Sequence, residues 1–282
     1  MQDAHCMLFY IAIILYNYQV NEQELIEYAR LYYPYAKNAS WIKWFVETAP
    51  LKAQRTLNIL KKYKNKSSKL LDCGCGIGVQ LFYLSSYYKH SIGVDVDPYA
   101  VKTAKKQLKK LNKKVLIKHY NGKRLPFPDS TFDIVTSLEV WEHAVSPQLM
   151  LKEITRVLKP DGVIFITTAN RLWPIEPHYN LPFLSYLPSP VSDWYVHGMK
   201  KAQYYHDIHL PTYPQFKKSV EEFFIVEDIT IDSIIDYKNL NLGKERGFLV
   251  IMAAKPLSFL RNHRSIPIVY KLSVIIEKLL RY

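Results

Sequence analysis

The fold is decided by Lys69-Leu70-Leu71-Asp72-Cys73-Gly74-Cys75-Gly76-Ile77-Gly78-Val79-Gln80. This stretch predicts a short buried strand, a glycine-rich turn and the start of a helix. The three glycines permit positive φ and a close approach of the backbone to a ligand. The helix that follows points its N-terminal N–H groups, and its positive dipole end, at whatever lies over the turn. A carboxylate or a phosphate suits that place.

The spacing of the glycines distinguishes two kinds of cofactor site. The dinucleotide fingerprint Gly-x-Gly-x-x-Gly/Ala requires a third small residue at the position of Val79. The observed Gly-x-Gly-x-Gly after Asp72 resembles motif I of the class I S-adenosylmethionine (SAM)-dependent methyltransferases, in which the turn lies against the methionine part of SAM. The resemblance implies a cofactor site at the turn, formed by Asp72, Cys73, Gly74, Cys75, Gly76 and Gly78.

A second strand is predicted over residues 91–97, and it ends in acidic residues. Asp95 lies about 20 residues past the turn, the distance at which a second strand presents a carboxylate to ribose hydroxyls. We expect Asp95, with the adjacent Val96, to bind the ribose of the cofactor. Alternatively, Asp95 is a turn residue or the cap of the helix that starts near Pro98.

Two further segments resemble the same family. Residues 125–135 read LPFPDSTFDIV, like the segment between the third and fourth strands of these methyltransferases, and residues 156–171 read RVLKPDGVIFITTANR, like their fifth strand. The family places an Asp at the position of Asn121 to meet the adenine amine. An Asn can still accept that hydrogen bond through its carbonyl oxygen. The resemblance therefore implies that Asn121 and the backbone N–H of Gly122 meet adenine.

The alternation of strands and helices from Lys69 onward predicts an α/β fold. We expect a doubly wound, seven-stranded, mostly parallel Rossmann-like sheet, with residues 224–231 and 247–254 as its final antiparallel pair. We expect an N-terminal helical region over residues 1–66, the methyltransferase domain over 67–255 and a C-terminal amphipathic helix over 256–282. Within the domain, an aromatic insertion after the fifth strand, residues 171–214, is expected to cap the acceptor pocket.

The pattern Glu139-x-x-Glu142-His143 follows the predicted fourth strand. His143 is our candidate base for deprotonating an acceptor hydroxyl, because imidazole titrates near neutral pH. Glu142 is assigned to catalysis with it, and Glu139 to the cofactor site. The same spacing occurs in ubiquinone-pathway O-methyltransferases and in small-RNA 2′-O-methyltransferases, some of which bind Mg²⁺ there. A further histidine such as His178 would complete a metal site, but we expect a metal-free cluster that positions the loop.

The composition is that of a globular protein, with 282 residues and a net charge of +13. The charge suits a nucleic acid, an anionic membrane surface or an acidic substrate, or reflects solvated lysine-rich faces. Three cysteines make no disulfide framework, and a metal-binding Cys-x-Cys lacks a second pair. The apolar run over residues 7–16 is too short to span a bilayer. We expect a cytoplasmic protein, with peripheral membrane contact through the basic amphipathic tail as an open alternative.

The predicted activity is methyl transfer from SAM to a hydroxyl of a small or lipophilic acceptor. RNA methylation is the alternative within this fold, supported by the net charge but not by any appended RNA-binding module. Two other classes stay open: an NAD-dependent oxidoreductase, which Val79 argues against, and a non-catalytic SAM-binding partner protein. The acceptor, the oligomeric state and the docking of the C-terminal helix are not given by the sequence.

Overall fold

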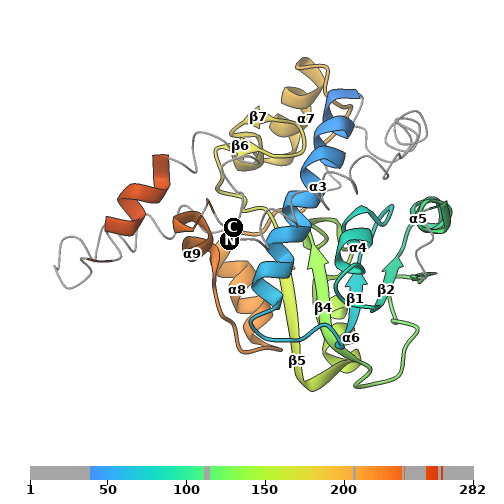
Figure 1. The fold of residues 1–282 in the computed structure, drawn as a ribbon. Helices are drawn as coiled ribbons and strands as arrows, with labels where there is room; N and C mark the ends of the chain where they lie inside the picture. The colour runs from blue at the N-terminus through green and yellow to red at the C-terminus, as the bar shows by residue number, and fades with distance from the viewer. Residues whose placement is uncertain are drawn as a thin grey trace. The chain divides into compact units, whose positions relative to one another are not determined.

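The computed structural model describes residues 39–110, 115–205, 208–236, 238, 252–259 and 262. The chain divides into two compact units, Met1–Thr136 with Val157–Phe165 and Ser137–Arg156 with Ile166–Tyr282. Figure 1 shows the elements, and each unit is described by itself.

A five-stranded sheet in the order β3-β2-β1-β4-β5 forms the centre of the first unit. The strands are β1 (Lys69–Cys73), β2 (His90–Asp95), β3 (Leu116–His119), β4 (Phe132–Leu138) and β5 (Leu158–Thr167). Strand β1 pairs in parallel with both β2 and β4, and β2 pairs in parallel with β3. The strand order therefore reverses at β1, which is where open α/β sheets bind their ligands.

Helices lie against this sheet (Figure 1) and share one apolar core with it. They are α3 (Ala39–Leu60), α4 (Val79–Leu84) and α5 (Pro98–Lys110). Leu70 and Leu71 of β1 are fully buried, as the apolar run predicts. On α5, Val101, Ala104 and Leu108 are buried, while the lysines at 102, 105, 106 and 109 are exposed. Helix α5 is therefore amphipathic, and its lysines form a solvated face.

The second unit is built from short elements around longer helices. They are the 3₁₀ turn η1 (Trp141–His143), α6 (Pro147–Val157), β6 (Ile175–Glu176), β7 (Leu181–Pro182), η2 (Leu184–Tyr186), α7 (Ser189–Gly198), α8 (Tyr213–Glu221) and α9 (Thr230–Ile235). Strands β6 and β7 pair antiparallel as a separate two-stranded sheet. The residues of the predicted insertion therefore have defined structure, while the role of cap stays a prediction.

The predicted strand over residues 224–231 is wrong. In the structure, residues 224–229 form no strand and α9 begins at Thr230. Asp228 accepts a hydrogen bond from the Thr230 N–H at 2.9 Å, and Ile231 and Ile234 pack at helical spacing against Ala254 and Leu257. Burial on a 3.6-residue period thus outweighs the β-branched composition.

The partner strand, predicted over 247–254, is not confirmed either. Residues 252–254 belong to a helix over 252–259, and residues 247–251 lie outside the described part of the chain. A seven-stranded sheet is therefore not confirmed. The predictions for residues 1–38 and for the tail beyond residue 262 also lie outside that part. No helix among the described residues is long and apolar enough to cross a membrane.

Candidate functional site

The glycine turn after β1 has the backbone that its sequence predicts. Gly74, Gly76 and Gly78 have φ of 82°, 51° and 83°. The N–H groups of Gly74 and Cys75 both donate to the Val94 carbonyl, at 2.9 and 3.0 Å, which joins the turn to β2. A Cβ at Gly78 would lie 3.1 Å from the Ala104 Cβ, whereas one at Gly76 would meet nothing within 4 Å. Gly78 therefore serves helix packing, and Gly76 borders open space.

Asp95 is held by the glycine turn itself. Its Oδ2 accepts the Gly76 N–H at 2.7 Å, and its Oδ1 accepts the Asp97 N–H at 2.9 Å. Burial raises the pKa of Asp95, although these hydrogen bonds oppose the rise. Asp97 accepts the Tyr99 N–H at 2.8 Å, so Asp97 makes the local contact with the start of α5. Asp95 therefore makes the local turn contact that we considered for it, whereas Asp97 takes the place at the start of α5.

Asp72 is a buried acid at the end of β1. The Thr136 hydroxyl donates to its Oδ1 at 2.8 Å across the β1–β4 pair. Burial raises the pKa of Asp72 to about 7; the Thr136 hydrogen bond lowers it, and the charge of Asp95 adds to the rise. Two neighbouring acids with raised pKa values are typical of functional sites and seldom serve structure alone.

The cysteines of the turn behave as small apolar residues. Cys73 and Cys75 are free and buried, and burial raises the pKa of Cys73 to about 12 and that of Cys75 well above its ordinary value. A Cβ at Gly93 would lie 2.8 Å from the Cys75 Sγ, so the thiol fills space against β2. These protonated thiols are poor metal ligands, because the thiolate is the ligating form.

The predicted adenine contacts lie in the loop after β3. The Asn121 Oδ1 accepts hydrogen bonds from the N–H groups of Lys123 and Arg124, at 3.0 and 3.1 Å. Both lone pairs of that oxygen are thus used, which disagrees with the predicted acceptance of the adenine amine. Gly122 has φ of 73°, and a Cβ there would lie 3.5 Å from the Val96 Cγ1. Val96, which follows β2, is half exposed, and its side chain lies beside Gly122 in this exposed loop.

A separate cluster of acids and histidines belongs to the second unit. Glu139 follows β4 directly, and its φ of 58° bends the chain into η1. The Glu139 N–H donates to the Thr167 carbonyl at 3.0 Å. On η1, Glu142 is almost fully buried and accepts the Thr168 hydroxyl at 2.8 Å, while His143 is exposed. Burial raises the pKa of Glu142.

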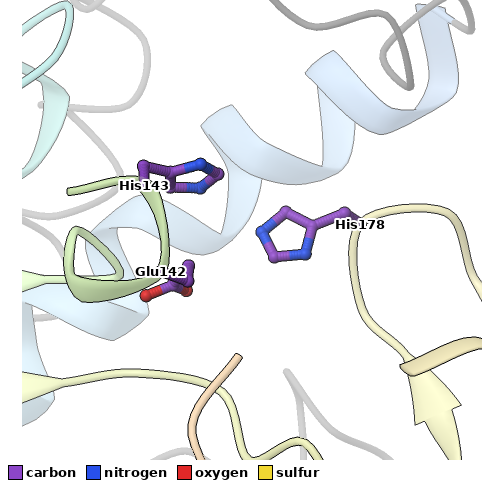
Figure 2. Close-up of side chains that lie close together, drawn as sticks. All are labelled: Glu142, His143 and His178. Atoms are coloured by element: carbon purple, nitrogen blue, oxygen red, sulfur yellow. The ribbon is translucent and has the colours of Figure 1, made fainter. Parts of the chain in front are cut away.

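His178 joins Glu142 and His143, as Figure 2 shows. One potential ligand atom from each of the three side chains lies within 4.8 Å of the others. The His143 and His178 rings meet edge to face, with centroids 5.2 Å apart. Glu139, which shares the sequence pattern, does not belong to this group. The structure therefore assembles the histidine-completed cluster that we considered from sequence and set aside.

Glu176 is the functional candidate that the sequence did not reveal. Its Oε1 accepts a hydrogen bond from the His178 Nδ1 at 2.7 Å, and its Oε2 accepts the Tyr179 N–H at 2.7 Å. Burial lowers the pKa of His178, but the carboxylates of Glu176, Glu142 and Glu139 outweigh it and raise the pKa. A Glu-x-His pair two residues apart is too common a pattern to have identified it.

Comparison with known proteins identifies the protein family to which the chain belongs. Residues 71–166 match the family described as the methyltransferase domain. An uncharacterized protein of Methanocaldococcus jannaschii is 31% identical over 206 residues, 70% of this chain and 83% of its own length. A probable S-adenosylmethionine-dependent methyltransferase of Mycolicibacterium smegmatis is 31% identical over 36% of this chain and 38% of its own.

A ubiquinone biosynthesis O-methyltransferase of Pelagibacter ubique is 31% identical over 40% of this chain and 50% of its own. The chain thus spans half or less of the length of these two named relatives. The chain belongs to the class I SAM-dependent methyltransferases, and SAM is its methyl donor. The oxidoreductase, RNA and non-catalytic alternatives are not favoured.

Proposed function

We propose that the protein methylates a hydroxyl group of a small or lipophilic molecule. The observation that carries this proposal is the Glu142–His143–His178 cluster, which offers groups that can take a hydroxyl proton. A matched relative, that of Pelagibacter ubique, is named as an O-methyltransferase of ubiquinone biosynthesis. Glu139 directly follows β4, and ligand-binding residues of open parallel sheets follow the carboxyl ends of strands.

The first unit supplies the cofactor site in this proposal. Asp72 and the glycine turn hold the methionine end of SAM, and Gly76 gives the backbone close access. Asp95 accepts hydrogen bonds from the ribose hydroxyls. The Gly76 and Asp97 N–H groups fix the orientation of its carboxylate, which has about four acceptor positions in all and so can still accept from hydroxyls. Adenine lies against Val96 and the Gly122 backbone, with Asn121 shaping the loop.

The transfer itself is an in-line displacement. The acceptor oxygen forms a bond to the methyl carbon while the carbon–sulfur bond breaks, and the sulfur keeps the electron pair. The hydroxyl proton passes to His143, the exposed member of the cluster, and then to solvent. The protein otherwise contributes alignment and exclusion of water.

A transfer assay tests the proposal. The full chain is incubated with methyl-labelled SAM and a panel of phenols, catechols, hydroquinones and matched amines. We expect label in the hydroxyl compounds, with kcat reduced at least about 100-fold in His143→Ala. The matched control is His90→Ala, which replaces an exposed histidine at the start of β2 and leaves kcat unchanged. Label found only in the amines would contradict the proposed acceptor class.

A further inference from the structure

Helix α5 has one face on which every charge is positive. Its sequence, Pro98–Lys110, contains five lysines and no acidic residue. Where the structure describes the lysine side chains, at positions 102, 105, 106 and 109, all of these residues are exposed. Their spacing of three and four residues places them on one side of the helix, over about 10 Å of its length. The buried residues Val101, Ala104 and Leu108 occupy the other side.

The position of α5 in the first unit turns this face outward. Strand β3 is an edge strand of the sheet, and α5 packs against β3 and β2 (Figure 1). The apolar side of α5 belongs to the core that the sheet and its helices share. No apolar stripe of this helix is therefore left to insert into another phase. The part of α5 that can meet a partner is the convex row of lysines.

We propose that this lysine face, defined as Lys102, Lys105, Lys106 and Lys109, docks the protein on an anionic lipid membrane. The contact is electrostatic, with the ammonium groups lying against lipid phosphates and the helix remaining outside the hydrocarbon. It stands on the charges and the position of α5. Its use, which is to bring the enzyme to an acceptor dissolved in the bilayer, rests on the lipophilic acceptor proposed above.

Repulsion within the lysine face favours an anionic partner over water alone. Lys102 and Lys106 are four residues apart, as are Lys105 and Lys109. Like charges at this spacing destabilise a helix, and exposed helix faces ordinarily mix both signs of charge. Helix α5 contains no acid of its own to relieve the repulsion. An anionic membrane surface relieves it, and the attraction of each lysine to that surface adds to that of the others.

The shape and composition of the face favour lipid over nucleic acid. Proteins that bind single-stranded nucleic acid combine a basic groove with several aromatic side chains on which bases stack. Helix α5 contains one aromatic residue, Tyr99, which is 55% exposed at the N-terminal end of the helix. A single convex helix does not enclose a strand, but it can lie against a plane of headgroups. The amphipathic tyrosine ring suits such a boundary between polar and apolar surroundings.

Vesicle sedimentation with the full chain tests this docking. Vesicles of phosphatidylcholine alone are compared with vesicles in which phosphatidylglycerol replaces a third of that lipid. We expect at least about 100-fold tighter binding to the anionic vesicles, and release as the salt concentration rises from about 0.1 M to about 0.5 M. Glutamine preserves helix propensity and removes the charge. We therefore expect at least about 100-fold weaker binding in the fourfold variant Lys102→Gln, Lys105→Gln, Lys106→Gln and Lys109→Gln.

A matched control removes the same number of charges outside α5. It combines four substitutions of exposed lysines: Lys62→Gln, Lys66→Gln, Lys152→Gln and Lys218→Gln. We expect this variant to bind anionic vesicles within about threefold of the wild type, because exposed charges more than a Debye length from the surface are screened. S-adenosylhomocysteine (SAH) binding and the melting temperature are measured on both variants, and preserved values show that each is folded.

Equal binding of the wild type to neutral and anionic vesicles, or no binding to either, would overturn the docking proposal. Equal losses in the two fourfold variants would also overturn it, because net charge rather than the lysine face would then be responsible. Binding of a single-stranded RNA through the lysine face, without vesicle binding, would replace the lipid by a nucleic acid. Transfer to hydroxyl acceptors is measured separately without vesicles. Vesicle binding without any hydroxyl transfer would contradict the proposed function and leave the docking standing.

Discussion

At the scale of single residues, the first unit places two buried acids beside its glycine turn. Asp72 and Asp95 each have a raised pKa because burial disfavours the carboxylate. Both positions were predicted from the sequence, because short strands that end in acid next to a glycine turn form a recognisable pattern. Glu176 and its contact with His178 were not predicted, because that contact depends on the chain path after β5 rather than on local spacing.

The raised pKa of Asp72 predicts a pH-dependent stability. In the folded state the pKa is about 7, above the ordinary value of 3.8. Its stabilising contribution is therefore complete below pH 3.8 and is lost as the pH rises through about 7. We expect Asp72→Asn to remove this loss, so that it gains about 2–4 kcal/mol relative to the wild type between pH 5 and pH 8.

Urea denaturation of both proteins at the two pH values measures this difference. The matched control is Asp129→Asn, on an exposed turn, which should follow the wild type. Equal pH dependence in wild type and Asp72→Asn would show that Asp72 ionises normally.

The same substitution is expected to act differently at two glycines of the turn. Gly78→Ala places a Cβ 3.1 Å from that of Ala104 at φ of +83°, so we expect a loss of stability of about 1–3 kcal/mol. The Cβ added by Gly76→Ala would meet nothing within 4 Å. Its positive φ is expected to lower the free energy of unfolding by about 1–2 kcal/mol. Its added methyl points into open space, where we place the cofactor.

We therefore expect Gly76→Ala to weaken SAH binding at least tenfold while it stays folded at 25 °C. Thermal denaturation and SAH calorimetry on the two variants separate the effects. An unchanged SAH affinity in Gly76→Ala would contradict the placement of the cofactor beside Gly76.

At the scale of elements, the sequence predicted β1 to β5 and the helices between them, because buried parallel strands are short apolar runs with clear boundaries. It failed after α8. Residues 224–231 alternate partly and are rich in isoleucine, so strand and helix patterns compete there. Ile231 and Ile234 pack against Ala254 and Leu257, and this packing favours a helix. Because these residues are about 20 positions apart, a short stretch of sequence does not reveal the contact.

A pair of isoleucines tests this assignment. In a strand, Ile225 and Ile231 would share one face. In the structure Ile225 is fully exposed and Ile231 is 8% exposed. We expect Ile231→Ala to cost about 2–4 kcal/mol and Ile225→Ala to cost less than about 0.5 kcal/mol. Denaturant unfolding measures both, and comparable costs would support a strand.

At the scale of the whole molecule, the sequence predicts the cofactor side of the proposed site better than the acceptor side. The matched domain, residues 71–166, contains the glycine turn and the two acids, where function imposes a fixed spacing. The proposed acceptor side also uses residues beyond the matched domain, which are joined to it or to one another by contacts distant in sequence. One joins the His209 N–H to the Glu142 carbonyl at 2.8 Å, and another joins the Arg171 N–H to the Pro211 carbonyl at 2.8 Å. Such pairings leave no periodicity in the sequence.

The most direct test of the cofactor assignment is calorimetric titration of the full chain with SAH, and in parallel with NAD. We predict one SAH bound per wild-type chain, no NAD binding, and at least tenfold weaker SAH binding in Asp95→Ala. The matched control is Asp97→Ala, which removes a carboxylate from the same loop and should retain the SAH affinity. Binding of NAD instead of SAH, or equal SAH affinity in Asp95→Ala and the wild type, would contradict the site described here.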